Sequence, residues 1–165
     1  MNKLISKLAE RVLHLSPDLT HSQLFDETTF YNRFLKDLKA AKKEIIIESP
    51  YITTTRMFSF LRIFEALVSR KVKIYVITRN PEDHDLTMRT QAEQEIRKLE
   101  MLGVQVLLSA EYSHRKLAII DRQILWEGSL NILSQSCSRE IMRRIESKSH
   151  VQEGFDFINL GKYIY

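Results

Sequence analysis

Three short apolar runs, largely of β-branched residues, alternate with longer helical segments along the first two thirds of the chain. Short runs of this kind are typical of buried strands, and apolar residues three and four apart are typical of amphipathic helices. Because a helix separates each strand from the next, the pattern predicts βαβ units with parallel strands. We therefore expect an α/β fold with a mixed, mostly parallel central sheet flanked by helices on both faces. The expected strands are residues 44–48, 72–78 and 104–108, and the expected helices are residues 27–42, 57–70 and 86–102.

A polar segment beyond the third strand contains the residues best suited to chemistry. Residues 117–120 form a short apolar run that predicts a buried strand, and His114 and Lys116 stand at its start. Because side chains two apart in a strand share one face, an imidazole and a positive charge are expected to point the same way. Asp121 has the opposite parity, so we assign it a structural role that ties the strand to a neighbouring basic group.

A second expected strand, residues 124–127, leads to a glycine and two residues with short hydrogen-bonding side chains. Gly128 lacks a Cβ atom, which lets the backbone approach a ligand closely. Ser129 and Asn131 supply a hydroxyl and an amide. An imidazole, an ammonium group, a hydroxyl and an amide at one place suit a phosphate group. The ammonium and the amide would bind its non-bridging oxygens while the imidazole attacks phosphorus.

The spacing of these residues resembles the HKD motif of the phospholipase D superfamily. The motif begins with His-x-Lys at His114, continues through four residues, an aspartate and six residues, and ends with Gly-Ser-x-Asn at Asn131. The resemblance covers residues 28–147 and is to the small endonucleases that carry a single motif. The stretches Glu-Ser-Pro-Tyr-Ile-Thr from Glu48 and Thr-Arg-Asn-Pro from Thr78 are also similar to HKD domains fused to helicase-like ATPases. The resemblance implies a phospholipase D-like architecture.

The resemblance also implies a metal-independent phosphodiesterase that uses no cofactor. His114 would attack phosphorus and become a phosphohistidine, while Lys116, Asn131 and Ser129 bind the charged oxygens. Relatives carry a carboxylate at some distance beyond the asparagine, and Glu140 is the position that fits. Its carboxylate would orient a ring nitrogen of the histidine and fix the tautomer.

The chain contains one copy of the motif. The leaving alkoxide requires a proton, and a second histidine on the opposite side is the natural donor. Superfamily members with one motif pair two protomers across a twofold axis. The resemblance therefore implies a homodimer with one composite active site.

Two further candidates follow the first two expected strands. In open α/β sheets, ligands bind beyond the carboxyl ends of the strands. Tyr51 is therefore a candidate for the wall of the site, and the guanidinium of Arg79 is a candidate for holding a second phosphate. Residues 82–85, Glu-Asp-His-Asp, are interpreted as a polar loop that caps the next helix, because consecutive side chains rarely point at one metal ion. A metal site in this loop is the less favoured alternative.

The two ends of the chain are assigned to regions outside the catalytic domain. Residues 1–26 are expected to form an N-terminal amphipathic helix and a polar, turn-like linker. The phospholipase D-like domain is expected to span residues 27–147, with residues 139–145 as its last strand. Residues 148–165 are expected to form a C-terminal tail.

Composition bears on location and partners. The single cysteine, Cys137, excludes an internal disulfide and indicates a cytoplasmic location, and we expect its thiol to be buried. No stretch approaches the length of about 20 apolar residues that a membrane span needs, so we expect no membrane partner. Lys and Arg outnumber Asp and Glu by 25 to 21, an excess that permits a polyanionic partner.

The leading hypothesis is a nuclease that cleaves DNA, or RNA, with little sequence preference. The arginines that flank the motif support it, at positions 139, 143 and 144. One alternative is a phospholipid phosphodiesterase. The other is a nucleic-acid-binding or dimerisation module that serves a helicase-type partner or fusion with little catalysis of its own.

Overall fold

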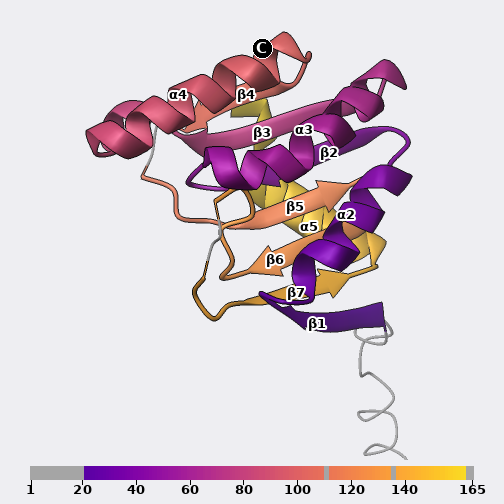
Figure 1. The fold of residues 1–165 in the computed structure, drawn as a ribbon. Helices are drawn as coiled ribbons and strands as arrows, with labels where there is room; N and C mark the ends of the chain where they lie inside the picture. The colour runs from indigo at the N-terminus through magenta and orange to yellow at the C-terminus, as the bar shows by residue number, and fades with distance from the viewer. Residues whose placement is uncertain (1–20, 110–111, 135–136, 163–165) are drawn as a thin grey trace, which may run out of the picture.

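The computed structural model describes residues 21–109, 112–134 and 137–162, which form a seven-stranded sheet with helices on both faces (Figure 1). The strands follow the order β1-β7-β6-β5-β2-β3-β4 across the sheet. They are β1 (Ser22–Asp26), β2 (Glu44–Glu48), β3 (Lys73–Arg79), β4 (Gln105–Ser109), β5 (Leu117–Ile120), β6 (Ile124–Gly128) and β7 (Ile141–Ile145). The helices are α2 (Phe30–Ala40), α3 (Thr54–Ser69), α4 (Leu86–Met101) and α5 (Lys148–Ile158), with the short 3-10 helices η2 (Pro81–Asp83) and η3 (Leu160–Lys162).

The sheet is mixed, but the expectation that it is mostly parallel is wrong. Strands β2, β3 and β4 are parallel, as their helical crossovers require. The pairs β2–β5, β5–β6, β6–β7 and β7–β1 are antiparallel. A three-residue turn joins β5 to β6, and so short a connection can join only antiparallel neighbours. The βαβ pattern therefore holds for the first half of the sheet and does not extend to the second.

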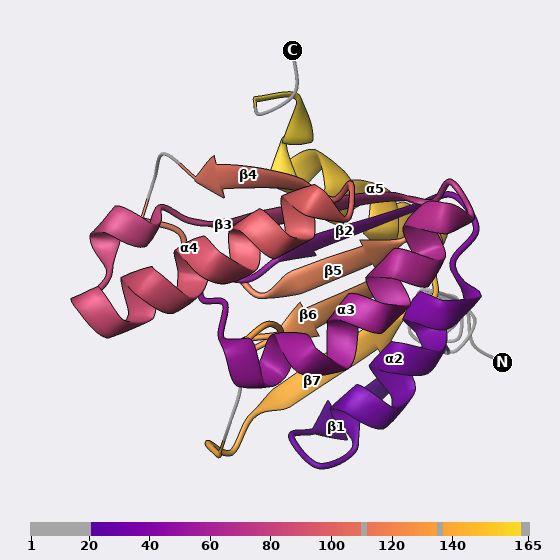
Figure 2. The same cartoon turned by 45° about the horizontal axis from the view of Figure 1, so that its top comes forward.

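Two layers of apolar side chains hold the helices to the sheet. Helices α2, α3 and α4 cover one face and α5 covers the other (Figures 1 and 2). Strand β2 shows why both faces are buried: Ile45 and Ile47 pack with the cluster under α2 and α3, whereas Ile46 packs with the cluster that includes Val151 and Ile158 of α5. Alternation of side chains along a strand explains this division. The expected α/β architecture, with helices on both faces, is confirmed.

The turn between β5 and β6 ties the antiparallel half of the sheet to its centre. Asp121 and Arg122 have φ values of 52° and 56°, which close a tight hairpin. The Asp121 carboxylate accepts hydrogen bonds from the backbone N–H groups of Lys42, Lys43 and Glu44, at 2.8, 2.7 and 3.0 Å. Asp121 thus anchors its strand through backbone amides at the start of β2, and among the described residues no basic side chain is its partner.

Both ends of the described chain contribute to the fold. Residues 22–26, expected in a turn-like linker, form the edge strand β1 on β7. Its exposed and half-buried positions give no clear alternation, which explains why the sequence did not predict it. Helix α5 occupies the segment expected to be a tail, and its apolar face is buried on the sheet. The expected helix in residues 1–15 lies outside the described residues.

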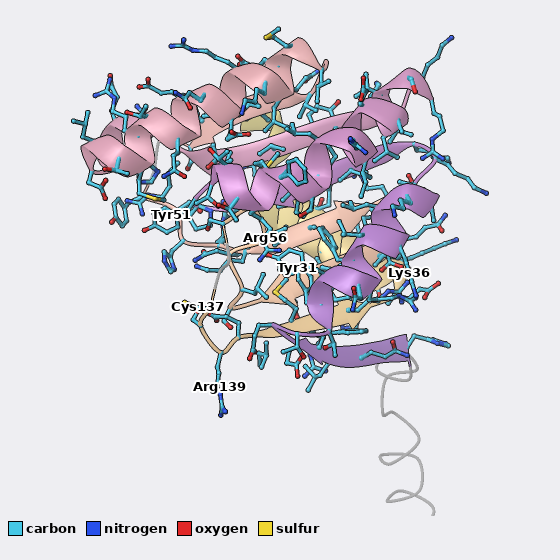
Figure 3. All side chains as sticks on the ribbon, in the orientation of Figure 1. Tyr31, Lys36, Tyr51, Arg56, Cys137 and Arg139 are labelled. Carbon is cyan, nitrogen blue, oxygen red and sulfur yellow. The ribbon has the colours of Figure 1, made fainter. Side chains whose placement is uncertain are left out.

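Cys137 and the arginines that flank the motif differ in their exposure. Cys137 is exposed rather than buried (Figure 3). Arg144 is only 5% exposed and pairs with Asp37, so it cannot contact nucleic acid from this position, whereas Arg139 projects into solvent (Figure 3). Among the described helices, none combines the length and the apolar character that crossing a membrane requires.

Candidate active site

The motif residues flank the start of β5 and the end of β6, and the neighbouring strands β2 and β3 end at the same side of the sheet (Figure 1). Antiparallel pairing places Leu117, the first residue of β5, opposite both Glu48 at the end of β2 and Glu127 near the end of β6. Parallel pairing places the end of β3 beside the end of β2. The N–H of Gly128 donates to the carbonyl of Lys116 at 3.2 Å, which closes this edge. Segments far apart in the sequence therefore meet next to His114.

His114 and Lys116 point the same way, as their spacing predicts. The Lys116 Nζ atom lies 2.5 Å from His114 Nδ1, and it also donates to the His114 carbonyl oxygen. Lys116 is 9% exposed, so its charge is held in a largely buried position. A charged ammonium can only donate, and therefore Nδ1 is the acceptor and the neutral ring carries its proton on Nε2.

The surroundings favour an uncharged imidazole. Partial burial lowers the pKa of His114, and the positive charges of Lys116 and Arg79 lower it further. Burial also lowers the pKa of Lys116, while the negative charge of Glu140 opposes this shift. His114 is thus kept uncharged, which nucleophilic attack requires.

This shift gives a pH dependence with a definite sign. Because the protonated ring is disfavoured, the neutral fraction of His114 should persist to a lower pH than in an ordinary histidine, whose pKa is about 6.5. We expect NMR titration of the His114 ring to give a midpoint below that value. In Lys116→Met the midpoint should rise, because one repelling charge is gone. A wild-type midpoint at or above the ordinary value would contradict this electrostatic picture.

Glu140 and Ser129 lie together beside the lysine. Hydroxyl hydrogen bonds from Ser129 and then Ser138 lower the pKa of Glu140, with a further contribution from the charge of Lys116. The Ser138 bond is 2.8 Å long. Within the described part of the chain, Glu140 has no hydrogen bond to His114. The expected role of Glu140 in orienting the histidine ring therefore finds no direct contact here, and the carboxylate instead lies where it stabilises the charge of Lys116.

Gly128 is required by close packing against strand β7. A Cβ atom built at this position would lie 2.2 Å from the carbonyl oxygen of Ile141 and 2.8 Å from the sulfur of Met142. Ile141 also binds Ser129 through both backbone groups: its carbonyl accepts from Ser129 N–H at 2.9 Å and its N–H donates to Ser129 Oγ at 3.1 Å. Any shift at Gly128 would therefore move Ser129.

We expect Gly128→Ala to destabilise the fold and displace the serine. Overpacking of this kind costs about 1–3 kcal/mol in the free energy of unfolding. Gly161→Ala is a matched control, because the nearest atom to its added Cβ is 4.0 Å away. Thermal unfolding followed by circular dichroism should show a lower midpoint for Gly128→Ala and an unchanged midpoint for the control. Equal midpoints for the two variants would show that β7 moves to accommodate the added methyl group without loss of stability.

Asn131 lies in the turn after β6, and this turn is fixed to the loop after β2. Leu133 accepts a hydrogen bond from Thr53 N–H at 3.0 Å and donates its own N–H to Ser49 Oγ at 3.2 Å. The Oδ1 atom of Asn131 is buried and has no hydrogen-bond partner among the described residues. An amide with unused hydrogen-bonding capacity is therefore held at the same edge of the sheet as the end of β2.

Tyr51 and Arg79 adjoin the histidine, as expected for residues at the ends of β2 and β3. The Tyr51 ring packs edge-on against His114, with 6.3 Å between ring centroids, and its hydroxyl accepts a 2.8 Å hydrogen bond from Arg79 Nη1. Figure 3 shows Tyr51 at this edge, with Lys36 at the opposite end of the molecule. Arg79 is 1% exposed, and its guanidinium lies 3.4 Å from the ring centroid of Tyr112. It therefore faces aromatic rings rather than open solvent.

The loop after β3 behaves as a polar capping loop. The Asp85 side chain accepts from Met88 N–H at 3.0 Å and so caps the N-terminus of α4, as the preferred interpretation predicts. Glu82 instead approaches Arg89, at 3.6 Å. His84 turns towards Tyr51, with ring centroids 5.1 Å apart. These side chains have separate partners and do not point at one position.

Two residues that the sequence did not predict as part of the site are Glu48 and Tyr112. Glu48 is 1% exposed, and its Oε1 atom accepts from Ser113 Oγ at 2.7 Å and from Arg115 Nε at 2.8 Å. It therefore holds the residues on either side of His114. A glutamate is rarely buried without a partner. The position of Glu48 at the end of an apolar strand could therefore have predicted that it binds a polar group at the site. Tyr112 lies in an irregular loop, where no periodicity marks it.

Comparison with known proteins identifies the family of the chain and structures with a similar fold. Residues 34–156 match the family model described as "Cardiolipin synthase, PLD-like domain". No curated protein matches the chain. NucT from Helicobacter pylori is 19% identical, with a TM-score of 0.66 over 82% of this chain and 91% of that one. Nuc from Salmonella typhimurium, a phospholipase D family member, is 13% identical, with a TM-score of 0.69 over 82% and 90%.

A third similar structure is TrmBL2, an archaeal chromatin protein whose structure shows a novel mode of DNA binding. It is 12% identical, with a TM-score of 0.57 over 94% of this chain and 56% of TrmBL2. At these identities the structures show a shared fold. The family match spans most of the chain, including the whole motif from His114 to Asn131. The chain therefore belongs to the family of phospholipase D-like domains, within the phospholipase D superfamily that its motif resembles.

Proposed function

We propose that the protein is a metal-independent nuclease that cleaves phosphodiester bonds, in DNA first of all, through a phosphohistidine on His114. The observation that carries this proposal is the buried Lys116 ammonium held against the His114 ring. This pair combines an uncharged imidazole nucleophile with a fixed positive charge for the phosphate oxygens. A net charge of +4 and the fold shared with a DNA-binding chromatin protein support a nucleic acid as the substrate.

The reaction would proceed in two displacements at phosphorus. In the first, a ring nitrogen of His114 forms a bond to phosphorus as the bond to the leaving oxygen breaks, and the leaving alkoxide takes a proton from a second histidine. In the second, water attacks phosphorus and gives a proton back to the second histidine, the phosphorus–nitrogen bond breaks, and both histidines are restored. Lys116, Asn131 and the hydroxyl of Ser129 bind the oxygens on which negative charge develops.

The contact between Lys116 and His114 has a consequence for the order of events. Attack by Nε2 requires the tautomer with the proton on Nδ1, which cannot form while the ammonium donates to Nδ1. Binding of a phosphate would draw Lys116 to an oxygen and free Nδ1. Glu140 supports this exchange, since its charge keeps Lys116 protonated.

A second protomer would supply the second histidine. A groove of about 620 Å³ lies on the α5 side of the sheet, and its lining includes Lys116 and Gly128. Leu24, Ile141 and Phe157 line the same groove and are each more than half exposed, at 59%, 59% and 66%. Exposed apolar residues gathered beside a site are typical of a protein interface. The groove therefore supports a homodimer whose composite active site lies next to it.

The test is cleavage of single-stranded DNA, plasmid DNA, RNA and phosphatidylcholine vesicles in EDTA, across a series of protein concentrations. We expect nucleic acid to be cut without metal, and the rate per protomer to rise with concentration as dimers form. Cleavage of the lipid alone would replace the nuclease with a phospholipid phosphodiesterase. Binding of nucleic acid with no cleavage would indicate a module that serves a helicase-type partner.

A further inference from the structure

A second feature of the site concerns the base of the substrate rather than its phosphate. We propose that Tyr112, backed by the buried Arg79, is a stacking platform for an unpaired nucleobase, so that the site takes single-stranded nucleic acid. This inference rests on the proposed function for its substrate class and adds the part of the nucleotide that is recognised. The contacts of Arg79 carry it.

Arg79 supports the platform by packing its guanidinium against one face of the Tyr112 ring. Its guanidinium is 1% exposed and lies 3.4 Å from the ring centroid of Tyr112, while Nη1 donates to the hydroxyl of Tyr51 at 2.8 Å. Arg79 Nε is buried without a hydrogen-bond partner in the part of the chain that the structure describes. A buried cation without a carboxylate partner is costly, and an aromatic face offsets part of that cost. The stack with Tyr112 is therefore a specific contact of the buried charge.

The opposite face of the Tyr112 ring is available to a ligand. Tyr112 is 74% exposed although one face rests on the guanidinium, and a ring of that size seldom stays so open without a partner. It stands two residues before His114 in the same loop. Ser113 lies between them and is held by Glu48 at 2.7 Å, which limits how far the two side chains can separate.

Tyr51 completes the support of this loop. Its ring contacts His114 on one side and His84 on another, with centroid distances of 6.3 and 5.1 Å. Its hydroxyl accepts a hydrogen bond from the Arg79 guanidinium, which stacks on the Tyr112 ring. The platform and the nucleophile thus share Tyr51 as a neighbour, so a base on Tyr112 would have its own backbone phosphate near His114.

Only an unpaired base can use such a platform. In a duplex each base is stacked on both faces by its neighbours, and reaching a protein ring requires the base to leave the helix. In a single strand the bases are free to stack on aromatic side chains, and every base offers a π-face, so the contact is tolerant of sequence. The platform therefore predicts selection for strandedness without selection for sequence.

The test separates the base from the backbone. Fluorescence anisotropy would compare a labelled oligothymidylate with an oligomer of the same length that lacks all bases, both bound to His114→Ala so that nothing is cleaved. We expect the bases to improve affinity on the order of tenfold. Tyr112→Leu keeps the guanidinium covered but removes the π-face, and it should reduce this preference to about threefold or less. Tyr112→Phe is the matched control and should retain it.

The outcomes distinguish this inference from the proposed function. A preference for bases that is unchanged in Tyr112→Leu overturns the platform, even where the wild-type protein cleaves DNA. A preference that depends on the ring supports the platform, even where the wild-type protein cleaves nothing. Equal affinity for single strands and for duplex of the same sequence, or no binding of either, also overturns it.

Discussion

Replacing His114 with alanine is expected to lower the rate of phosphodiester cleavage by at least about a thousandfold, because the variant has no nucleophile for the first displacement. Lys116 and the other groups proposed to bind phosphate remain, so binding of single-stranded DNA should be retained. The measurement is the initial rate of oligonucleotide cleavage in EDTA at saturating substrate, with binding followed in parallel.

His21→Ala is the matched control for this prediction. His21 is exposed and precedes β1, at the strand edge farthest from β4. Its removal should leave the rate unchanged. Without a nucleophile, only a small residual rate is expected. A His114→Ala protein that keeps more than about a tenth of the wild-type rate would therefore exclude His114 as the nucleophile.

Replacing Asp37 with alanine should produce the largest loss of stability. Asp37 lies on the buried face of α2. Its carboxylate accepts hydrogen bonds from Arg144 Nε at 2.7 Å and from Trp126 Nε1 at 3.1 Å. The Asp37 and Arg144 side chains are 8% and 7% exposed. Removing one member of a buried pair costs about 3–5 kcal/mol in the free energy of unfolding, and here it would leave Arg144 with Glu146, whose side chain is 58% exposed, as a partner. Trp126, which is fully buried, would also lose the partner of its indole N–H.

Urea denaturation measures this loss directly. Asp156→Ala serves as the control, because Asp156 is an exposed residue of α5 whose carboxylate accepts from Gln152 on the same helix. Its stability should stay within about 0.5 kcal/mol of the wild type. A loss of less than about 1 kcal/mol for Asp37→Ala would show that Glu146, which accepts from Arg144 Nη1 at 2.9 Å, compensates the arginine by itself.

The parallel half of the sheet could be predicted because each strand is a continuous apolar run and each crossover is an amphipathic helix. Ile45, Ile46 and Ile47 are buried on both faces, and such a run has few alternatives to a central strand. In the antiparallel half, the strands that became β5, β6 and β7 were also expected, but their antiparallel direction was not, and β1 was missed because it is an edge strand with little burial. Direction in that half is set by the hairpin turn at Asp121, whose left-handed backbone does not show in hydrophobic periodicity.

The centre of the site could be predicted because its residues lie close together in sequence. His114 and Lys116 stand two residues apart just before β5 and point the same way, so local geometry suffices to bring them together. Glu48 and Tyr112 could not be placed, because their partners belong to other segments: Glu48 binds Ser113 and Arg115 across the β2–β5 pairing. The burial of Arg79 depends on Tyr112 and Tyr51, which come from two different loops.

The most direct measurement of the central proposal is the mass of the protein during turnover. The reaction with a single-stranded oligonucleotide would be stopped in alkaline denaturant, because phosphohistidine is labile to acid, and analysed by intact-mass and peptide mass spectrometry. In EDTA we expect an adduct of one substrate fragment on the peptide that contains His114, and no adduct on His114→Ala. Cleavage that proceeds without any adduct and stops when EDTA is added would contradict a covalent, metal-independent mechanism.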